Sequence, residues 1–388
     1  MTSGTSSGRS ELDPSELSVP IDAKRAEGIL SSTEGDREWL GELARENTKE
    51  AVTYSRNVTI PVTRLCRNRC AYCGFRRDRD AYLLWDDIKP ILLRAEERGC
   101  CEALFLTGEK PEQIDDGARA FLSEHGFRST PEYVAWLCGR TIDETNLLPH
   151  TNIGVLNADE IRELKEVNAS MGLMLEDASP RLCGPGMAHH RSPGKVPARR
   201  IRTLEIAGEV GVPMTTGLLI GIGQTRREIA DSLSVIEDIH ERHGHIQEII
   251  IQRFVPKPDT PMASWESPPT PLMLNCFLAA RLMFGIGMNL QVPPNIEPEF
   301  ELFLRNGAND LGGISTITPD YINPRHEWVR EGEIYKKVSE MGLRVEVRPP
   351  VYPEYVRAEL MAPGVKGRTE EWIRRMKGDG RRLDFSCR

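Results

Sequence analysis

Short apolar runs alternate with longer amphipathic stretches from about residue 57 onward. Apolar runs of about four to eight residues between turn residues are typical of buried strands, whereas apolar residues spaced about three and four apart are typical of helices. The apolar runs predict strands over 58–63, 102–107, 147–151, 170–176, 214–220, 248–253, 288–292 and 309–313. The helical spacing predicts helices over 85–98, 197–210, 226–243 and 271–284.

Strands that alternate with helices pair in parallel through right-handed crossovers. The eight predicted strands therefore indicate an α/β fold, a closed parallel (β/α)8 barrel of the TIM type. A partial (β/α)6 barrel is the alternative, because the last two predicted strands are weakly patterned.

The segment before the barrel differs from it in composition. Residues 1–50 are rich in Ser, Gly and Thr and then become acidic. They predict an N-terminal helical extension, with helices over 22–31 and 36–54 and a disordered first dozen residues.

The barrel is expected over 51–355, since the Pro-rich segment 349–353 breaks the strand and helix pattern. Residues 356–388 are expected to form a C-terminal tail with one short basic helix over 368–376. We expect this tail to be a solvated appendage.

Composition and charge narrow the class of protein. The 388 residues are 39% hydrophobic and 28% charged, which is ordinary for a soluble globular protein. A net charge of −8 argues against general binding to nucleic acid or anionic membranes. No apolar run approaches the ~18 residues of a membrane span, and no signal-peptide core follows Met1. The nine cysteines suit a reducing compartment, so we expect a cytoplasmic protein.

Three cysteines on one short loop carry the strongest chemical signal. Cys66, Cys70 and Cys73 follow the first predicted strand with C-x3-C-x2-C spacing. Three thiolates can hold three irons of a 4Fe–4S cluster and leave the fourth iron without a cysteine ligand. Structural zinc normally takes four ligands, and disulfide frameworks belong to small secreted chains. A zinc-binding scaffold nevertheless stays as the non-enzymatic alternative.

Polar and glycine residues follow other predicted strands. In a parallel barrel these loops share the mouth that carries catalytic groups. Glu176 ends the fourth strand, where a carboxylate can accept both hydroxyls of a ribose, or pair with a neighbouring arginine on the surface. Further polar residues at predicted strand ends are His150, Asn152, Arg253, Gln291, Asn309 and Asp310.

The cysteine spacing, with Tyr72 just before the last cysteine, resembles the signature of radical S-adenosylmethionine (SAM) enzymes. The resemblance implies that backbone and carboxylate groups after the second strand bind the methionine end of SAM, and that a glycine-rich segment after the fifth strand packs along the adenine. The SAM-binding residues that it implies are Tyr72, Gly108, Glu109, Glu176, Gly221 and Gln224.

Several longer segments resemble one family within that group, the 7,8-didemethyl-8-hydroxy-5-deazariboflavin synthase subunit of coenzyme F-420 biosynthesis. These segments are 55–58, 65–73, 107–112, 148–152, 171–176, 215–223 and 318–324. The chain departs from the family pattern at Ile153, where Pro is expected, and at Arg253, where Asn is expected.

The resemblance implies a radical SAM lyase. Its substrate is the 5-amino-5-(4-hydroxybenzyl)-6-(ribitylimino)-5,6-dihydrouracil adduct supplied by a partner subunit. Hydrogen abstraction by a 5′-deoxyadenosyl radical, ring closure and ammonia loss then give the deazaflavin. His150 and Asp310 are the predicted proton acceptor and donor, and a flavodoxin or ferredoxin is the expected electron donor.

A second enzymatic hypothesis stays open. The same cluster could serve the partner-type reaction, which joins a tyrosine-derived hydroxybenzyl group to the diaminouracil, or another radical SAM reaction on an aromatic substrate.

Overall fold

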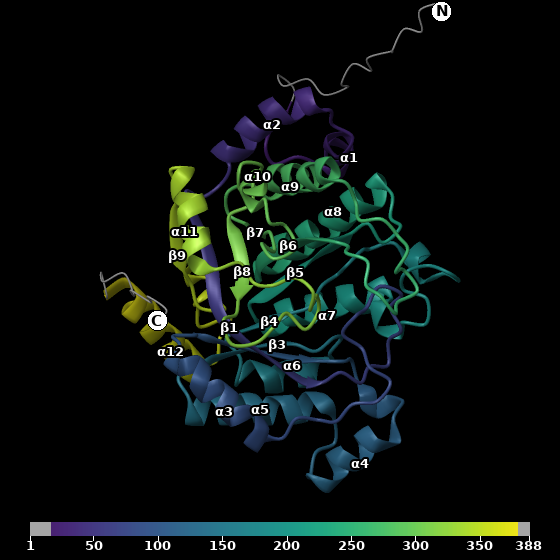
Figure 1. Cartoon of the computed structure of the whole chain (residues 1–388), viewed down its shortest axis with the longest axis vertical. Coiled ribbons are helices and arrows are strands. Elements are labelled where there is room, and N and C mark those ends of the chain that lie inside the picture. The colour runs from purple at the N-terminus through teal and green to yellow at the C-terminus, as the bar shows by residue number, and fades with distance from the viewer. Residues whose placement is uncertain (1–16, 379–388) are drawn as a thin grey trace, which may run out of the picture.

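The computed structural model describes residues 17–378, and eight parallel strands form a closed barrel within them (Figure 1). The strands are β1 (Ala51–Thr63), β2 (Glu102–Thr107), β3 (Leu148–Asn152), β4 (Ser170–Gly172), β5 (Met214–Ile220), β6 (Ile246–Arg253), β7 (Asn289–Gln291) and β8 (Asp310–Ile314). Each strand pairs with the next, and β1 pairs with both β2 and β8, which closes the barrel. The eight-unit prediction is confirmed, and the six-unit alternative is wrong.

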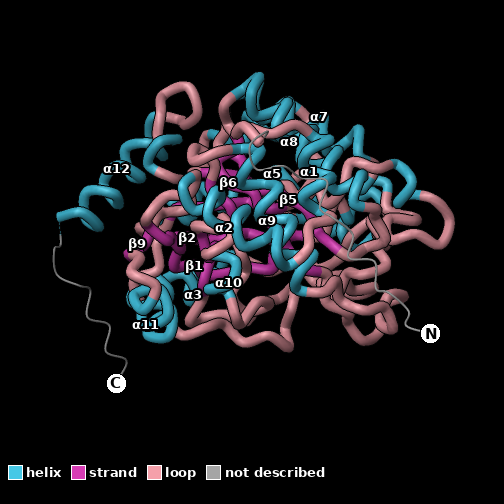
Figure 2. The backbone as a smooth tube through the Cα atoms, turned by 90° about the horizontal axis from the view of Figure 1, so that it is seen from above, coloured by secondary structure: helices cyan, strands magenta, loops and turns pink. Residues whose placement is uncertain are grey.

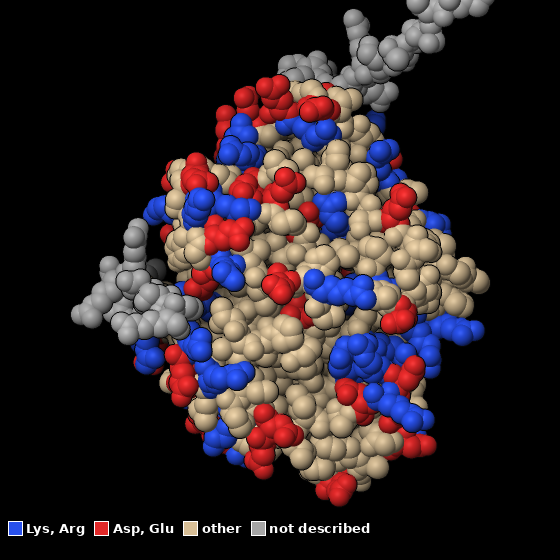
Figure 3. Space-filling view, in the orientation of Figure 1, with Lys and Arg blue, Asp and Glu red and all other residues tan. Residues whose placement is uncertain are grey.

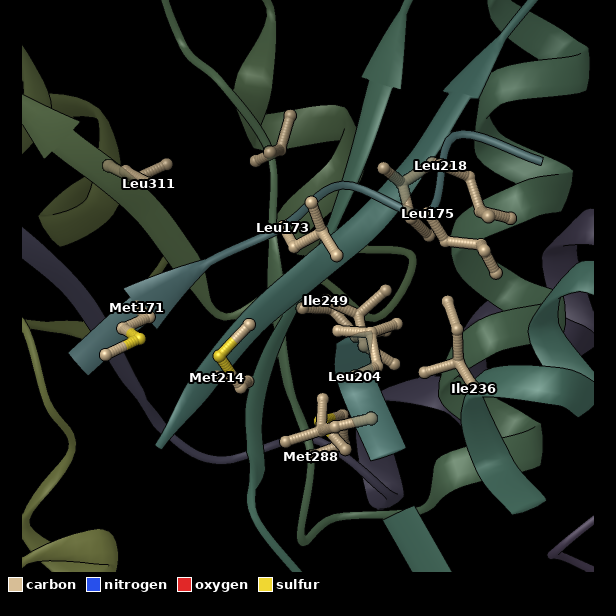
Figure 4. Packing of buried hydrophobic residues seen from close by; sticks show 14 of the residues in the cluster. Met171, Leu173, Leu175, Leu204, Met214, Leu218, Ile236, Ile249, Met288 and Leu311 are labelled. Carbon is tan, nitrogen blue, oxygen red and sulfur yellow. The ribbon is translucent and has the colours of Figure 1, made fainter. Parts of the chain in front are cut away.

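Helices surround the barrel, as the view from above shows (Figure 2). They are α3 (Trp85–Glu97), α4 (Asp116–Glu124), α5 (Thr130–Glu144), α6 (Ala158–Lys165), α7 (Pro197–Val210), α8 (Arg226–His243), α9 (Thr270–Phe284), α10 (Phe300–Leu304) and α11 (Glu331–Glu340). In the core, Leu204 of α7 and Ile236 of α8 lie against side chains of β5 and β6 (Figure 4). Burial on both faces explains why these strands read as continuous apolar runs.

Local signals set the bounds of several elements. Thr225 caps the start of α8 through a capping box with Glu228, and Gly244 ends that helix in the left-handed conformation. The bounds of β2, β5, α7 and α8 are those that we predicted.

The second N-terminal helix and the fourth strand end earlier than predicted, and the first strand begins at Ala51 instead of residue 58. The helix predicted over 36–54 ends at Glu46, because residues 51–54 pair with the short strand β9 (Arg344–Val347) as the start of β1. The strand predicted over 170–176 stops at Gly172. Glu176 itself has a φ of 67°, a left-handed conformation that regular strand pairing does not accommodate.

Two N-terminal helices lie against α8 and α9 on the outside of the barrel (Figure 1). These are α1 (Ala23–Leu30) and α2 (Glu34–Glu46). The Asn275 amide of α9 donates hydrogen bonds to the carbonyls of Leu30 and Ser32. The predicted disorder of the first dozen residues falls outside the described part of the chain.

The C-terminal segment closes one end of the barrel, so our expectation of a solvated appendage is wrong. Tyr352, Leu360 and Val365 are buried in one cluster with Leu148, the first residue of β3. The helix α12 (Pro363–Gly378) is longer than the predicted one, and its Trp372 indole donates to the carbonyl of Asn146. No helix in residues 17–378 is both long and apolar enough to span a membrane.

We predict that Val365→Ala lowers the free energy of unfolding by about 1–3 kcal/mol, because it opens a cavity under α12. Val365 is 1% exposed, whereas its neighbour Lys366 makes only an exposed ion pair with Glu370. Lys366→Ala is therefore the matched control, with an expected change below about 1 kcal/mol. Urea unfolding measures both, and equal midpoints for the two variants would show that α12 is not packed on the barrel.

Candidate functional site

The loop after β1 brings the three cysteines to the carboxyl end of the barrel, the end that carries the functional loops of parallel barrels. The Cys66 sulfur accepts backbone N–H groups from Asn68 at 3.4 Å and from Glu109 at 3.2 Å. Such donors stabilise a thiolate. Cys70 and Cys73 line a cavity of about 800 Å³ beside this loop.

The three sulfur atoms lie close enough to influence one another. The pKa of Cys70 is raised to about 11, chiefly by burial; Lys195 and Ser192 oppose the rise, and the charges of Cys73 and Cys66 add to it. Bound metal relieves such repulsion, because a thiolate ligand is held deprotonated by the ion. The donor set, the N–H groups and the cavity therefore fit a 4Fe–4S cluster on Cys66, Cys70 and Cys73.

A mononuclear metal site has a different requirement, since all of its ligands must meet at one ion. In the described residues, no group of three or more His, Cys, Asp or Glu side chains is placed to hold a metal ion in that way. The Cys183 thiol, in the loop after β4, donates to the carbonyl of Lys195 at 3.7 Å.

A second loop, residues 180–195 after β4, holds the cysteine loop in place. The Ala71 N–H donates to the carbonyl of Ala188 at 2.8 Å, and the Gly194 N–H donates to the Asn68 side chain at 2.8 Å. The 180–195 loop thus holds the cysteine loop at Ala71 and at the Asn68 side chain.

Gly108 lies directly under the cysteine loop. A Cβ atom at this position would stand 1.8 Å from the Leu65 carbonyl oxygen, so only glycine permits the approach of β2 to the loop. The close approach to Leu65 is by itself enough to require glycine at position 108. The role of Gly108 in SAM binding stays a prediction.

Glu109 is 4% exposed and already paired within the protein. Its carboxylate accepts from the Arg67 guanidinium at 2.8 Å and from the Val155 N–H at 3.2 Å, and Arg200 stands 3.9 Å away. A Cβ at Gly194 would lie 1.7 Å from a Glu109 oxygen, which shows how closely this carboxylate is enclosed. Glu109 therefore positions the cysteine loop, and its predicted contact with SAM remains a prediction.

Glu176 and Tyr72 form the neighbouring part of the site. The Lys195 ammonium donates to Glu176 at 2.5 Å, and the Tyr72 hydroxyl bonds the His189 ring at 3.1 Å. Burial raises the pKa of Glu176, but the charges of Lys195 and Arg200 outweigh it and lower the pKa overall. Glu176 is thus an anion, as an acceptor of ribose hydroxyls must be.

The side chain of Gln224 stabilises the glycine-rich turn after β5, in which it lies. Gln224 accepts from the Ile222 N–H at 2.8 Å and donates to the Leu219 carbonyl at 2.7 Å. A Cβ at Gly221 would meet Pro268 at 2.6 Å, and the φ of Gly221 is 100°. These contacts shape the turn, and direct SAM contacts of Gly221 and Gln224 stay predictions.

A second cavity, of about 190 Å³, occupies the barrel lumen. His150 lines it from the middle of β3, and its Nδ1 bonds the Ser170 hydroxyl at 2.7 Å. Burial, and then the Arg348 charge, lowers the pKa of His150 to about 3. The ring is therefore neutral near pH 7 and a weak base, and its role as proton acceptor stays a prediction.

The expected position of Asp310 at a strand's carboxyl end is wrong. Asp310 begins β8 and is 0% exposed, at the opposite end of the barrel from the cysteine loop. Arg348 donates to both of its oxygens, at 2.7 and 2.8 Å. Asn309, expected at the same strand end, precedes β8 and accepts from the buried Arg281. These contacts give Asp310 a structural task, so its role as proton donor has no support in the geometry.

Sequence reasoning missed three cations that organise the site, Lys195, Arg200 and Arg348. Each pairs with an acid that lies far away in the chain, as Arg348 does with Glu248 at 2.8 Å. The only local signal for these cations was the basic segment 191–200 after Glu176. From the sequence, an arginine partner for Glu176 was considered, but Lys195 and Arg200 were not.

The comparisons with known proteins agree on one family. Residues 60–236 match the model of the Radical SAM superfamily. The chain is 47% identical over 311 residues to 7,8-didemethyl-8-hydroxy-5-deazariboflavin synthase of Methanopyrus kandleri, covering 79% of this chain and 93% of that protein. It is 43% identical over 360 residues to the synthase of the same name from Methanocaldococcus jannaschii, covering 91% and 99%.

Two solved structures share the fold. Methylornithine synthase aligns with a TM-score of 0.66 at 18% identity, over 84% of this chain and 94% of that chain. The FeFe-hydrogenase maturase HydG from Carboxydothermus hydrogenoformans aligns with a TM-score of 0.68 at 17% identity, over 92% and 87%.

We predict that Gly108→Ala prevents the cysteine loop from closing on β2 and lowers the iron bound after anaerobic reconstitution. The added methyl group has no room beside Leu65, as described above. Gly117→Ala in α4 is the control, because its added Cβ meets nothing closer than 3.1 Å and alanine favours a helix. Iron and sulfide per chain are the measurement, and a Gly108→Ala protein with full iron content would contradict this account of the loop.

A second prediction concerns pH and Glu248, which lies beside Asp310. Burial raises the pKa of Glu248 above its usual 4.5, Arg348 opposes this shift, and the Asp310 charge adds to it. The native protein thus keeps a proton that the unfolded chain releases, so this group lowers the free energy of unfolding as pH rises above 4.5. Relative to Glu248→Gln, the wild type should lose up to ~1.4 kcal/mol per pH unit in chemical unfolding. Parallel pH curves for the two proteins would contradict the shift.

Proposed function

We propose that this chain performs the ring-closing half of deazaflavin formation. The proposal starts from its family, because the chain belongs to the 7,8-didemethyl-8-hydroxy-5-deazariboflavin synthase family of radical SAM proteins. Its substrate is the 5-amino-5-(4-hydroxybenzyl)-6-(ribitylimino)-5,6-dihydrouracil adduct, and its products are the deazaflavin and ammonia. This lyase reaction serves coenzyme F-420 biosynthesis, and a separate partner subunit supplies the adduct.

The observation that carries the proposal is the position of the three thiols. Cys66, Cys70 and Cys73 lie on the loop at the carboxyl end of a closed barrel whose lumen holds a cavity lined by both polar and apolar side chains. When bound there, a 4Fe–4S cluster with one iron free of cysteine supplies the single electron that splits SAM into methionine and a 5′-deoxyadenosyl radical. The rest of the reaction depends on how the chain holds the reactants.

The chain's first task is to orient SAM beside the cysteine loop. Glu176 offers an anionic carboxylate for two ribose hydroxyls, and Lys195 keeps that carboxylate charged. Tyr72, fixed by His189, provides an aromatic surface next to it. Gly108, Glu109, Gly221 and Gln224 shape the loops around this position.

Its second task is to exclude water from a radical that attacks most C–H bonds. The reacting carbon must lie within contact distance of the radical, and the barrel walls and the two interlocked loops are the parts of the chain that can hold it there. His150 lines the lumen and is the proposed acceptor of the proton lost in ring closure.

The second hypothesis, the hydroxybenzyl-transferring partner reaction or another aromatic radical SAM reaction, uses the same cysteine loop and differs only in the substrate. The names of the relatives favour the deazaflavin product. Incubation with each candidate substrate separates the two, since only the adduct should give deazaflavin fluorescence.

An acidic one-electron carrier, such as a flavodoxin or ferredoxin, is the proposed reductant. The cavity beside Cys70 and Cys73 is lined by six cationic and two acidic side chains, although the whole chain has a net charge of −8. Figure 3 shows Lys and Arg side chains gathered at the lower right, over the loop that follows β1 in Figure 1. Among these, Arg191, Lys257 and Arg325 form no ion pair with any described residue.

We predict that Cys70→Ala forms no 5′-deoxyadenosine and no deazaflavin from SAM and adduct, because the cluster loses one of its ligands. Cys183→Ala should keep both activities, since that thiol bonds only to a backbone carbonyl. Mass spectrometry and fluorescence of anaerobic reactions with dithionite measure the two products. Wild-type protein that splits SAM but leaves the adduct unchanged would refute the proposed substrate.

We also predict that Arg191→Glu combined with Arg325→Glu slows turnover with a reduced flavodoxin by at least about tenfold at low ionic strength. Both side chains are exposed on the rim of the cavity. Turnover with dithionite should stay the same, because this small reductant needs no docking surface. The control is Arg25→Glu on the exposed face of α1. If turnover falls equally with flavodoxin and with dithionite, the two arginines act in the reaction itself and do not bind the electron carrier.

A further inference from the structure

Polar side chains line the barrel lumen at the end away from the cysteine loop. Asn57 of β1, Glu102 of β2 and Glu248 of β6 all line the lumen cavity. Asn57 pairs in register with Glu102, and Glu248 pairs with Thr215 of β5, so these side chains come from the lower halves of their strands. We call Asn57, Glu102 and Glu248 the lumen floor.

Asn57 carries an acceptor without a partner. Its side chain is 2% exposed, and its Oδ1 has no hydrogen-bond partner among the described residues. A buried amide oxygen without a donor is costly and marks a place where a ligand or water binds. Gly313 of β8 makes room for this amide, because a Cβ there would stand 2.2 Å from Asn57 Nδ2.

The Glu248 carboxyl of the lumen floor is already paired within the protein. Arg348 is the guanidinium that serves this region, and it donates to Asp310 as well as to Glu248. The hydroxyls of Tyr352 and Thr215 also donate to Glu248, at 3.0 and 2.9 Å. After these bonds are made, the Asn57 Oδ1 acceptor is the floor atom left without a donor among the described residues, and a ligand hydroxyl can supply one.

The size of the cavity limits what can enter. Its volume of about 190 Å³ lies below the roughly 300–1,000 Å³ of pockets that hold whole ligands. Only one arm of the proposed adduct therefore fits. The reacting carbon must stay near the cysteine loop at the other end, so the arm in the lumen is one that takes no part in the chemistry.

We infer that the lumen floor is a binding site for the polyhydroxylated ribityl arm of the substrate, with Asn57 Oδ1 as an acceptor for one of its hydroxyls. This inference rests on the proposed function and adds the direction in which the substrate lies. The hydroxybenzyl arm carries a single hydroxyl on an apolar ring. Its apolar ring would lie against the polar side chains of the floor, whereas a chain of hydroxyls both donates and accepts along its length.

The experiment compares two substrates on two proteins. One substrate is the natural adduct, and the other is an analogue in which an unsubstituted alkyl chain replaces the ribityl arm. The variant is Asn57→Leu, which keeps the shape of the side chain and removes its acceptor. We expect KM for the natural adduct to rise by about tenfold in the variant, the size of one lost hydrogen bond to a buried group. KM for the analogue should be the same in both proteins.

Controls separate this inference from the proposed function. Asn306→Leu at the end of α10 removes an amide that bonds only Leu302, and it should leave both KM values unchanged. Glu248→Gln is a second floor variant and should also reduce the preference for the ribityl arm if Asn57→Leu fails to fold. Iron content and circular dichroism establish that each variant is folded and loaded.

The outcomes are distinct. If wild-type protein makes no deazaflavin from the adduct, the proposed function fails and the inference fails with it. If wild-type protein does make deazaflavin, but Asn57→Leu changes KM for both substrates equally or for neither, the inference alone is overturned. It is also overturned if the variant is sensitive instead to loss of the phenol hydroxyl, because the other arm would then occupy the lumen.

Discussion

The buried carboxylate of Glu109 is the contact on which the arrangement of the site depends. It bonds Arg67 in the cysteine loop and the Val155 N–H after β3, and it lies against Gly194 and Arg200 from the segment after β4. A buried charge is stable only when its partners surround it closely. Glu109 therefore ties three loops together, and these loops hold the cysteines above the lumen.

A second buried network closes the opposite end. Arg348, from the C-terminal segment, holds Asp310 of β8 and Glu248 of β6 at once. One guanidinium cannot neutralise two carboxylates, which agrees with the upward shift in the pKa of Glu248. The C-terminal segment is thus part of the barrel's interior, and the floor of the lumen depends on residues far from the cysteine motif.

The sequence predicts most of the fold because its signals are local. Strand β5 is a buried apolar run, and α8 is bounded by a capping box and a glycine, so both could be read within a few residues. The cysteine loop was equally local. What could not be read depends on pairing across the chain: Arg348 meets Glu248 only after the barrel closes, and the short strand β8 contains too little pattern to show that Asp310 begins it.

The two networks explain how one barrel can serve both radical chemistry and recognition of a polar substrate. Radical chemistry needs a dry upper lumen, whereas a polar ligand arm needs groups that would attract water. The structure separates the two demands along the barrel axis, with the thiols and Glu176 at the carboxyl end and the acceptors of Asn57 and Glu248 below. A ligand whose hydroxyl donates to Asn57 Oδ1 would take the place of water at the floor, at the end of the barrel away from the thiols.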